Sequence, residues 1–325
     1  MSRDSYDPVG ELGNNKRERR YNTGRFERDF QESQVTRDLN FKQRISKHES
    51  GIMAAAKKDV VTIPPTTTIM GAARTMVDYG YRRLPVADPG TKRLEGICTV
   101  LDIIDFLGGG EKSRIIERNY DGNLIVAINS SIRDIMQQNV VVVTDDSSLE
   151  DAINTMVQRS VGGVPVVSED GRVVGILTER DVVRIMSQSI TGKKVEDIMS
   201  RNVRTAPPDM PIESAAQTMI SSGFRRLPVV TNGIVVGFIT ATDIMRYLGS
   251  GEAFKKLVTG NVHEAFGAPI KSIMKGDLIT VSPDDDLGST AIMMARNGIG
   301  SLPVISDGRL AGILTEYDIL MSLKG

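Results

Sequence analysis

The chain has 325 residues, of which 40% are hydrophobic, and its formal net charge at pH 7 is −1. This length suggests about two or three domains with a sizeable core, and the charge excludes a protein that is basic throughout. The single cysteine, Cys98, excludes a disulfide framework, and no apolar run approaches the ~18 residues that span a bilayer. The first residues have no apolar segment typical of a secretory signal. We therefore expect a soluble, cytoplasmic protein without a membrane association.

Residues 1–48 form a basic extension with only five aliphatic side chains besides Met1, too few for a core. The segment KRERRYNTGRFER (16–28) interleaves basic and aromatic residues. This combination suits RNA, because cations contact phosphate and rings stack on unpaired bases. The candidate RNA-binding residues are Lys16, Arg17, Arg19, Arg20, Tyr21, Arg25, Phe26 and Arg28. A disordered, solubilising tail is the alternative interpretation of the same composition.

Four copies of one unit come after the extension. The first element of each is a short β-branched strand: VVTI (60–63), VVVV (140–143), VRT (203–205) and LITV (278–281). A helix comes next, because in the first three copies apolar residues recur at i, i+3, i+4, i+7 and i+8. In the first copy this stripe consists of Ile69, Ala72, Ala73, Met76 and Val77.

The second half of each unit is a strand containing a proline, followed by a Gly-apolar-x-Thr-x-x-Asp phrase. The prolines are Pro85, Pro165, Pro228 and Pro303, and the phrases are GICTVLD (96–102), GILTERD (175–181), GFITATD (237–243) and GILTEYD (312–318). Turns such as SEDGR and TNG predict a hairpin between the two strands, and the Thr–Asp end begins a last helix. Each copy is therefore predicted to be β-α-β-β-α, an α/β (α+β) fold.

The copies alternate in the residues that precede the proline strand. The first and third contain paired arginines, in GYRRLPVA and GFRRLPVV, whereas the second and fourth read SVGGVPVV and GIGSLPVI. The connections after the first and third copies also match each other, beginning LGGGE and LGSGE. A unit of roughly 60 residues is marginal alone. The pattern predicts two tandem modules, each a pair of copies.

These motifs resemble those of cystathionine-β-synthase (CBS) domains, and the pairing resembles Bateman modules. Four copies without a catalytic domain are similar to the γ subunit of AMP-activated protein kinase and to archaeal four-CBS proteins, some of them ribosome hibernation factors. The expected domains are 1–48 (extension), 49–110, 111–190, 191–250 and 251–325 (CBS domains one to four). The modules would close into a four-domain disc either within one chain or by dimerisation.

The resemblance implies that clefts between paired domains bind AMP, ADP, ATP or a related adenosyl nucleotide. A carboxylate at a helix start can accept both ribose hydroxyls, and a threonine three residues earlier can cap the helix. The ribose candidates are Thr99, Asp102, Thr178, Asp181, Thr240, Asp243, Thr315 and Asp318. The same spacing is also a common capping box, and the two roles are compatible.

The phosphate candidates are Arg82, Arg83, Arg225 and Arg226, because arginine offers permanently charged, bidentate donors. A solvated turn without function is the alternative for such pairs. The resemblance places each pair near the aspartate of its own copy, which predicts cation-rich sites around Asp102 and Asp243. The reciprocal sites, around Asp181 and Asp318, would hold less phosphate charge, borrow charge or stay empty.

The adenine slot would be lined by Val161 and Ile299, with Tyr81 and Phe224 as further candidates that apolar packing explains equally well. We find no nucleophile–base pair, and His48 and His263 lack the spacing of metal ligands, so neither catalysis nor a metal is expected. The sequence predicts an adenine-nucleotide-sensing regulator that acts on a ribosomal subunit through its basic extension. The alternative is an energy-sensing regulatory subunit of a separate enzyme or kinase, with the extension as a protein-binding segment.

Overall fold

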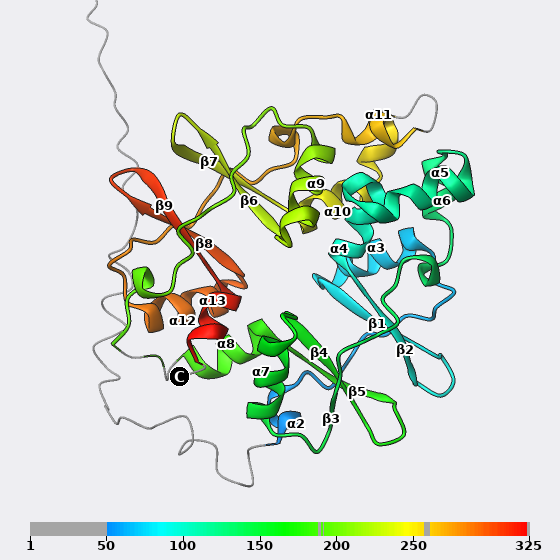
Figure 1. Ribbon diagram of the computed structural model, residues 1–325, viewed down its shortest axis with the longest axis horizontal. Coiled ribbons are helices and arrows are strands. Elements are labelled where there is room, and N and C mark those ends of the chain that lie inside the picture. The colour runs from blue at the N-terminus through cyan, green and yellow to red at the C-terminus, as the bar shows by residue number, and fades with distance from the viewer. Residues whose placement is uncertain (1–50, 188–189, 191, 257–260, 324–325) are drawn as a thin grey trace, which may run out of the picture. The chain divides into compact units, whose positions relative to one another are not determined.

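The computed structural model describes residues 51–187, 190, 192–256 and 261–323 (Figure 1). These residues belong to one compact unit, Ile45–Gly325. The candidate RNA-binding residues between 16 and 28 lie outside the described residues. The described elements therefore belong to the four repeats and to the connections between them.

A helix lies upstream of each proline strand, as the apolar stripes predict. In the first copy Ile69, Ala72, Ala73 and Met76 are fully buried, and the side chain of Thr68 accepts a hydrogen bond from the Gly71 amide at the helix start. Three of these helices end at a glycine in the left-handed region, where a residue without Cβ is favoured. The four helices are α3 (Ile69–Tyr79), α7 (Leu149–Gln158), α9 (Ile212–Ser222) and α12 (Leu287–Asn297).

Four antiparallel hairpins confirm the predicted pairing of the proline strand with the strand of the Gly-x-x-Thr phrase. The register places the residue before each Leu/Val-Pro pair opposite the threonine, as in Arg83 opposite Thr99 and Gly163 opposite Thr178. The hairpins are β1 (Arg83–Ala87) with β2 (Leu94–Thr99), β4 (Gly163–Val167) with β5 (Val173–Thr178), β6 (Arg226–Thr231) with β7 (Ile234–Thr240), and β8 (Ser301–Ser306) with β9 (Arg309–Thr315).

A last helix comes after every hairpin, beginning directly after the threonine. These helices are α4 (Val100–Ile104), which continues as the π-helix η1 (Asp105–Gly109), α8 (Glu179–Met186), α10 (Ala241–Gly249) and α13 (Glu316–Ser322). Short helical elements lie between and before the copies: α2 (Ile52–Ala55), η2 (Glu111–Ser113), α5 (Arg114–Tyr120), α6 (Leu124–Ile128), η3 (Ile132–Asp134), η5 (Val195–Asp197), η6 (Glu252–Lys256), α11 (Val262–Phe266) and η7 (Ile270–Ser272).

The predicted first strands are shorter than expected. Within the described residues, only the second copy forms a strand before its first helix. This strand is β3 (Val143–Thr144), which is parallel to β4. In the others a single parallel bridge remains, for example between Ile63 and Val86. The next hydrogen bond of such a parallel ladder is donated by the amide two residues after the bridged residue. That residue is Asp145 in the second copy, whose amide donates to a carbonyl of β4. In the other copies it is a proline, which has no amide hydrogen: Pro65, Pro208 and Pro283.

The copies pair as predicted, one with two and three with four. The segment after the Ile-Met pair of each copy forms an antiparallel bridge with the hairpin of its partner copy (Figure 1). These bridges are Lys57 with Ile176, Gln137 with Ile97, Ser200 with Ile313 and Lys275 with Phe238. Each domain is thus completed by its partner within the module.

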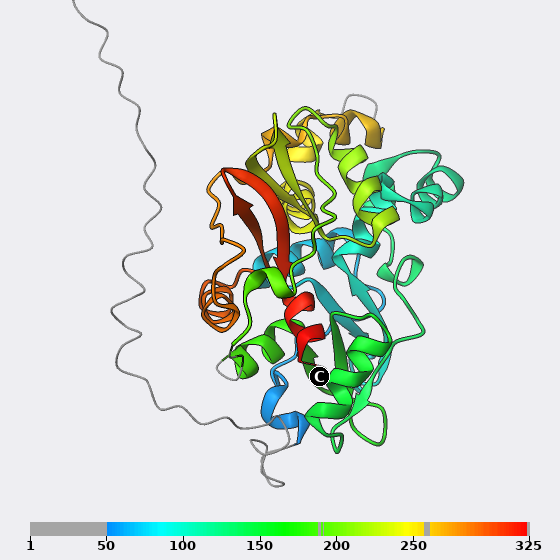
Figure 2. The ribbon, with the colours of Figure 1, turned by 60° about the vertical axis from the view of Figure 1, so that its left-hand side comes forward.

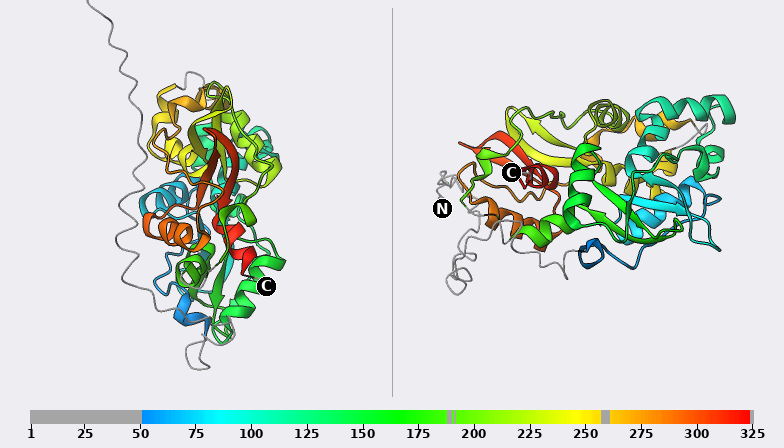
Figure 3. Two further views of the ribbon diagram at one scale, coloured as in Figure 1. Left: turned by 90° about the vertical axis from the view of Figure 1, so that its left-hand side faces the viewer. Right: turned by 60° about the horizontal axis from the view of Figure 1, so that its bottom comes forward.

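The two modules contact each other within the one chain. Helices α3 and α4 of the first copy and α9 and α10 of the third pack together and share one hydrophobic core. Helix α8 of the second copy packs against α12 and α13 of the fourth, as Figures 2 and 3 show. This packing brings the helix starts of the second and fourth copies close to the arginine pairs.

Candidate functional site

The aspartate of every Thr-x-x-Asp phrase is part of a helix cap. Its Oδ2 accepts hydrogen bonds from the amide and the hydroxyl of the threonine three residues earlier, at 2.8 and 2.6 Å for Asp102. The equivalent distances are 3.1 and 2.6 Å for Asp181, 3.0 and 2.5 Å for Asp243, and 2.8 and 2.6 Å for Asp318. In every copy the cap therefore engages Oδ2, and the expected acceptance of ribose hydroxyls by both oxygens stays a prediction.

The Oδ1 atoms of the first and third copies are held by cations of the same module. Lys112 Nζ donates to Asp102 Oδ1, and Gln137 Nε2 donates to it at 3.0 Å. Arg246 Nη1 donates to Asp243 Oδ1 at 2.8 Å. The Asp102 and Asp243 side chains are only 4% and 2% exposed. Protein groups therefore already satisfy the two aspartates that the sequence analysis placed with the arginines.

The Oδ1 atoms of the second and fourth copies are less engaged. The nearest cation to Asp181 Oδ1 in the described residues is Arg184, at 3.5 Å, and the Asp181 side chain is 17% exposed. Asp318 Oδ1 accepts a neutral hydrogen bond from Ser200 Oγ at 3.1 Å. Burial raises the pKa of Asp318, although the hydrogen bonds from Thr315 oppose the shift. These two carboxylates are the better placed to accept hydrogen bonds from a ligand.

Neither Arg82 nor Arg83 contacts Asp102 in the described residues, so the predicted grouping of this pair with the aspartate of its own copy is not seen. A cleft of about 260 Å³ contains both arginines together with Thr178 and Asp181 of the second copy. Arg83 Nη1 donates to the carbonyl of Gly163 at 2.8 Å. The reason is geometric. Arg83 and Gly163 each directly precede the Leu/Val-Pro pair of their own strand, and equivalent positions of two paired copies lie opposite each other.

The second module repeats this arrangement. Arg226 lies beside Gly300 of the fourth copy, since a Cβ built on that glycine would be 3.2 Å from Arg226 Nη2. The charge of Arg226 also lowers the pKa of Asp318, a smaller effect than burial. Arg226 therefore lies on the side of Asp318, whereas Arg225 donates to Glu179 of the second copy. The predicted grouping of both arginines with Asp243 is not seen in the described residues.

The glycines of the second and fourth copies provide room for the arginines of their partners. A Cβ at Gly162 would lie 2.8 Å from Arg83 Nη2, and one at Gly163 would lie 2.5 Å from Arg83 Nη1. A Cβ at Gly300 would lie 3.2 Å from Arg226 Nη2 of its partner copy and 2.9 Å from Arg82 Nη2 of the opposite module. The glycines of the second and fourth copies therefore leave room for arginines of the partner copy and, at Gly300, of the opposite module as well.

The arginines are crowded and incompletely neutralised. Burial, followed by repulsion from Arg225, lowers the pKa of Arg83 to about 10. Burial, then Arg225 and Arg82, lowers the pKa of Arg226 to about 9. In the described residues no hydrogen bond is seen to the Arg226 guanidinium. A site that depresses the pKa of arginine this far favours an added anion.

Aromatic side chains line one wall of the cleft. Tyr81 stacks on Tyr79, with ring centroids 5.5 Å apart, and the Lys57 ammonium lies 4.5 Å from the Tyr81 ring centroid and donates to its hydroxyl. Of the four predicted adenine-slot residues, Tyr81 lines this cleft. Val161 and Ile299 are partly buried and Phe224 is 42% exposed.

Sequence reasoning missed two buried glutamates, Glu179 and Glu316, which also line the cleft. The signal was present, because the second and fourth phrases read TERD and TEYD where the first and third have TVLD and TATD. It also missed Lys112, which lies ten residues after the aspartate it contacts, in a connection without a recognisable motif.

The described part of the chain holds neither a metal-binding cluster nor a reactive thiol. No group of three or more His, Cys, Asp or Glu residues there could hold a metal ion. Burial raises the pKa of the Cys98 thiol well above its usual range, which leaves it unreactive. None of the described helices has both the length and the apolar character needed to cross a membrane.

The fold and the site define a chain of four domains, each a helix, a β-hairpin and a second helix, paired through bridges between the N-terminal segment of one domain and the hairpin of its partner. The family model of the CBS domain matches residues 52–109, 132–188, 195–250 and 270–325. The chain therefore belongs to the CBS-domain family.

Several archaeal proteins are similar to it over most of their length. Protein MJ1225 of Methanocaldococcus jannaschii, proposed as an archaeal homologue of γ-AMPK, is 42% identical over 268 residues, which cover 82% of this chain and 96% of that protein. Its crystal structure matches with a TM-score of 0.80 and 41% identity over 84% of this chain and 99% of that one. A 33.4 kDa protein in a ribosomal RNA operon of Thermofilum pendens is 29% identical, covering 81% of this chain and 88% of that protein. A conserved protein of Pyrococcus horikoshii shares the fold, with a TM-score of 0.54 and 24% identity over 84% and 99% of the two chains.

Proposed function

We propose that the protein is a non-catalytic regulator that binds adenine nucleotides, AMP, ADP or ATP, in two clefts. Each cleft combines the arginine pair of one copy with the threonine and aspartate of its partner. Arg82 and Arg83 would bind phosphate while Asp181 Oδ1 accepts a ribose hydroxyl, and the equivalent roles in the second module fall to Arg225, Arg226 and Asp318.

The observation that carries this proposal is the composition of the cleft at Asp181. It joins incompletely neutralised guanidinium groups, a helix-start carboxylate whose Oδ1 has only a long contact with Arg184, and an aromatic wall within about 260 Å³. That volume is close to the lower end of the range for small-ligand sites, about 300 Å³. The likeness of this chain to MJ1225, proposed as an archaeal homologue of γ-AMPK, supports the same ligand class.

Calorimetric titration of the full chain with AMP, ADP and ATP tests the proposal. We expect about two nucleotides per chain. Asp181→Asn with Asp318→Asn should weaken binding about tenfold or more. The matched pair Asp102→Asn with Asp243→Asn should leave the affinity unchanged, because those carboxylates already bind protein cations. Equal effects of the two pairs, or no binding by the wild type, would contradict the assignment.

For the target of regulation we propose a ribosomal subunit, bound through residues 1–48. Support comes from the basic, aromatic-containing composition of that segment and from the place of the Thermofilum pendens relative in a ribosomal RNA operon. A separate enzyme or kinase is the second candidate, favoured by the likeness to MJ1225.

Co-sedimentation with ribosomal subunits separates the two candidates. The full chain should co-sediment, with an affinity that falls steeply with salt as phosphate contacts require. A variant in which the six basic residues of the 16–28 segment are replaced by glutamine should not. If that variant co-sediments as well as the wild type, the segment does not anchor the protein to the ribosome. Capture of one enzyme in place of ribosomes would favour a separate enzyme or kinase as the target.

A further inference from the structure

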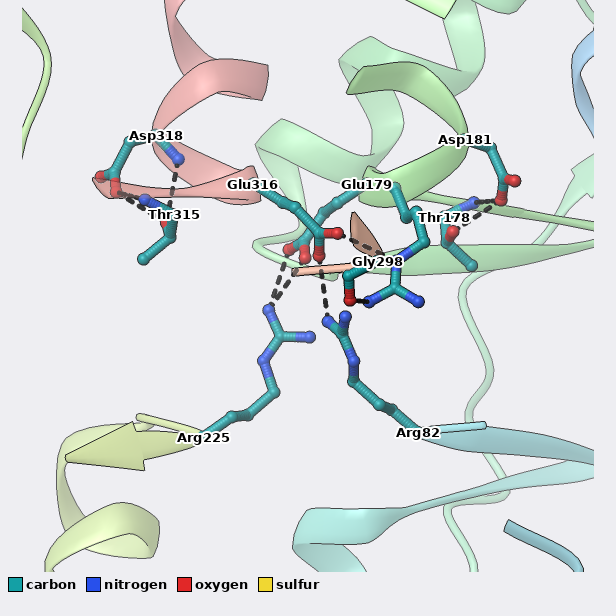
Figure 4. Close-up of polar contacts among 10 residues, drawn as sticks. Arg82, Thr178, Glu179, Asp181, Arg225, Gly298, Thr315, Glu316 and Asp318 are labelled. Carbon is teal, nitrogen blue, oxygen red and sulfur yellow. Dashed lines mark hydrogen bonds and ion pairs between the residues drawn. The ribbon is translucent and has the colours of Figure 1, made fainter. Parts of the chain in front are cut away.

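Glu179 and Glu316 are buried carboxylates at the first residues of α8 and α13, where the two modules meet (Figure 4). They are 2% and 3% exposed. A buried carboxylate is unfavourable unless it is paired. The first and third copies have the apolar residues Val100 and Ala241 at this position, so the acids are a specific feature of the second and fourth copies.

Both glutamates are paired with the opposite module's candidate phosphate-binding arginines. Arg82 Nη1 donates to Glu316 Oε2 at 3.1 Å. Arg225 Nη2 lies 3.0 Å from each of the two Glu179 oxygens. Arg180 Nε donates to the other Glu316 oxygen at 3.0 Å. Although burial opposes ionisation, Arg82 and Arg180 hold the pKa of Glu316 below its ordinary value.

The carboxylates lie where a ligand phosphate would have to bind. Both line the cleft that contains Asp181, and each stands at a helix start, where free amides favour an anion. Figure 4 shows the two glutamates in the centre, facing Arg82 and Arg225, with Asp181 and Asp318 at the flanks. Ligand phosphate and glutamate therefore compete for the same guanidinium donors.

We propose that Glu179 and Glu316 are internal anions that select the ligand by its charge, so that the clefts favour a nucleotide monophosphate over a triphosphate. This inference rests on the proposed function, since it concerns selectivity at the same clefts. Because the glutamates are anchored by their helices, they remain beside a bound phosphate and repel it. The repulsion grows with each further phosphate that the ligand carries.

The charge balance at the centre agrees with this selectivity. Five arginines (Arg82, Arg83, Arg180, Arg225 and Arg226) face Glu179 and Glu316, with Asp181 and Asp318 at the flanks, which leaves a surplus of one positive charge. A phosphate monoester at about −2 exceeds that surplus only slightly. A triphosphate exceeds it by far more, and the uncharged nucleoside leaves it unrelieved.

Calorimetric titration with adenosine, AMP and ATP tests the inference on the full chain. In the wild type we expect AMP to bind more tightly than ATP and adenosine. In Glu179→Gln with Glu316→Gln, affinity should rise about tenfold for AMP and about a hundredfold for ATP, and adenosine should stay within about twofold. Glu150→Gln, an exposed acid in the first turn of α7, is the matched control and should change nothing.

The outcomes separate this inference from the proposed function. If the wild type binds AMP and the glutamine variant shows the same AMP-to-ATP ratio, the inference fails and the nucleotide site stands. If ATP binds the wild type as tightly as AMP, the selectivity also fails, and this result needs no variant. If the wild type binds none of the three compounds, both proposals fall.

Discussion

Replacing Arg226 with methionine should stabilise the protein without nucleotide and weaken nucleotide binding in the second module. The guanidinium is partly buried beside other arginines, and its pKa is lowered to about 9 by burial and then by Arg225 and Arg82. Methionine retains much of the aliphatic stem and removes the charge. The substitution therefore isolates the electrostatic cost of the site.

The size of the effect can be worked from the pKa. A fall from 12.5 to about 9 corresponds to about 5 kcal/mol, at about 1.4 kcal/mol per pH unit. Solvent around the partly exposed side chain screens part of that cost, and methionine loses some of the packing. We expect a net gain of about 1–2 kcal/mol in the free energy of unfolding. Each kcal/mol should raise Tm by about 2–4 °C.

The sign of the pH dependence supplies a second readout. Below pH 9 the guanidinium is charged in both the folded and the unfolded state, so the folded state bears the full cost. As the pH rises above about 9, the folded state releases the proton first and the cost declines. The stability difference between Arg226→Met and wild type should therefore be constant near pH 7 and shrink above pH 9.

Thermal unfolding by calorimetry, with and without AMP, measures both effects. Without AMP the variant should melt above the wild type, and with saturating AMP the order should reverse, because the wild type gains from two filled clefts and the variant from the first alone. Arg204→Met, at an exposed arginine of the same copy, should do neither. A drop in Tm for ligand-free Arg226→Met would refute the claim that this charge is a cost.

Three further predictions concern the fold around the clefts. Gly163→Ala should lower the free energy of unfolding by about 1–3 kcal/mol, because its Cβ would lie 2.7 Å from the backbone carbonyl oxygen of Leu177, and should weaken AMP binding, because it would also displace Arg83 Nη1, 2.5 Å away. Gly276→Ala, with no atom within 4 Å of the added Cβ, is the control, and equal denaturant midpoints for the two would be incompatible with the steric argument. Glu316→Gln should be less stable than wild type near pH 7, with the difference declining as the pH falls below about 4.5 through the lower folded-state pKa. Urea titrations at several pH values check this, and a difference that persists at pH 2 would contradict it. Asp145→Pro should cost only about 1 kcal/mol, since it removes one ladder hydrogen bond and creates the proline found in the other copies; loss of cooperative melting would argue against that explanation.

Much of the fold could be predicted because its signals are local. The helical stripe beginning at Ile69 needs only the helix period, and the hairpins are indicated by turn residues between two apolar runs. The first strands were overestimated for an equally local reason: a parallel ladder needs amides, and Pro65 has none. The Thr-x-x-Asp phrase specified its cap correctly, since both partners lie within one turn.

The site could be predicted only in its parts. The sequence by itself determined two arginine pairs before the proline strands, four helix-start aspartates, and the alternation of Arg-Arg with Gly-Gly or Gly-Ser along the chain. Which aspartate serves which arginine depends on contacts between copies about 80 residues apart, as between Arg83 and Gly163. Long-range packing also placed Lys112 on Asp102 and Glu316 on Arg82. Tertiary structure decided these pairings because charged side chains are long and their partners are set by the approach of whole domains, which no local period encodes.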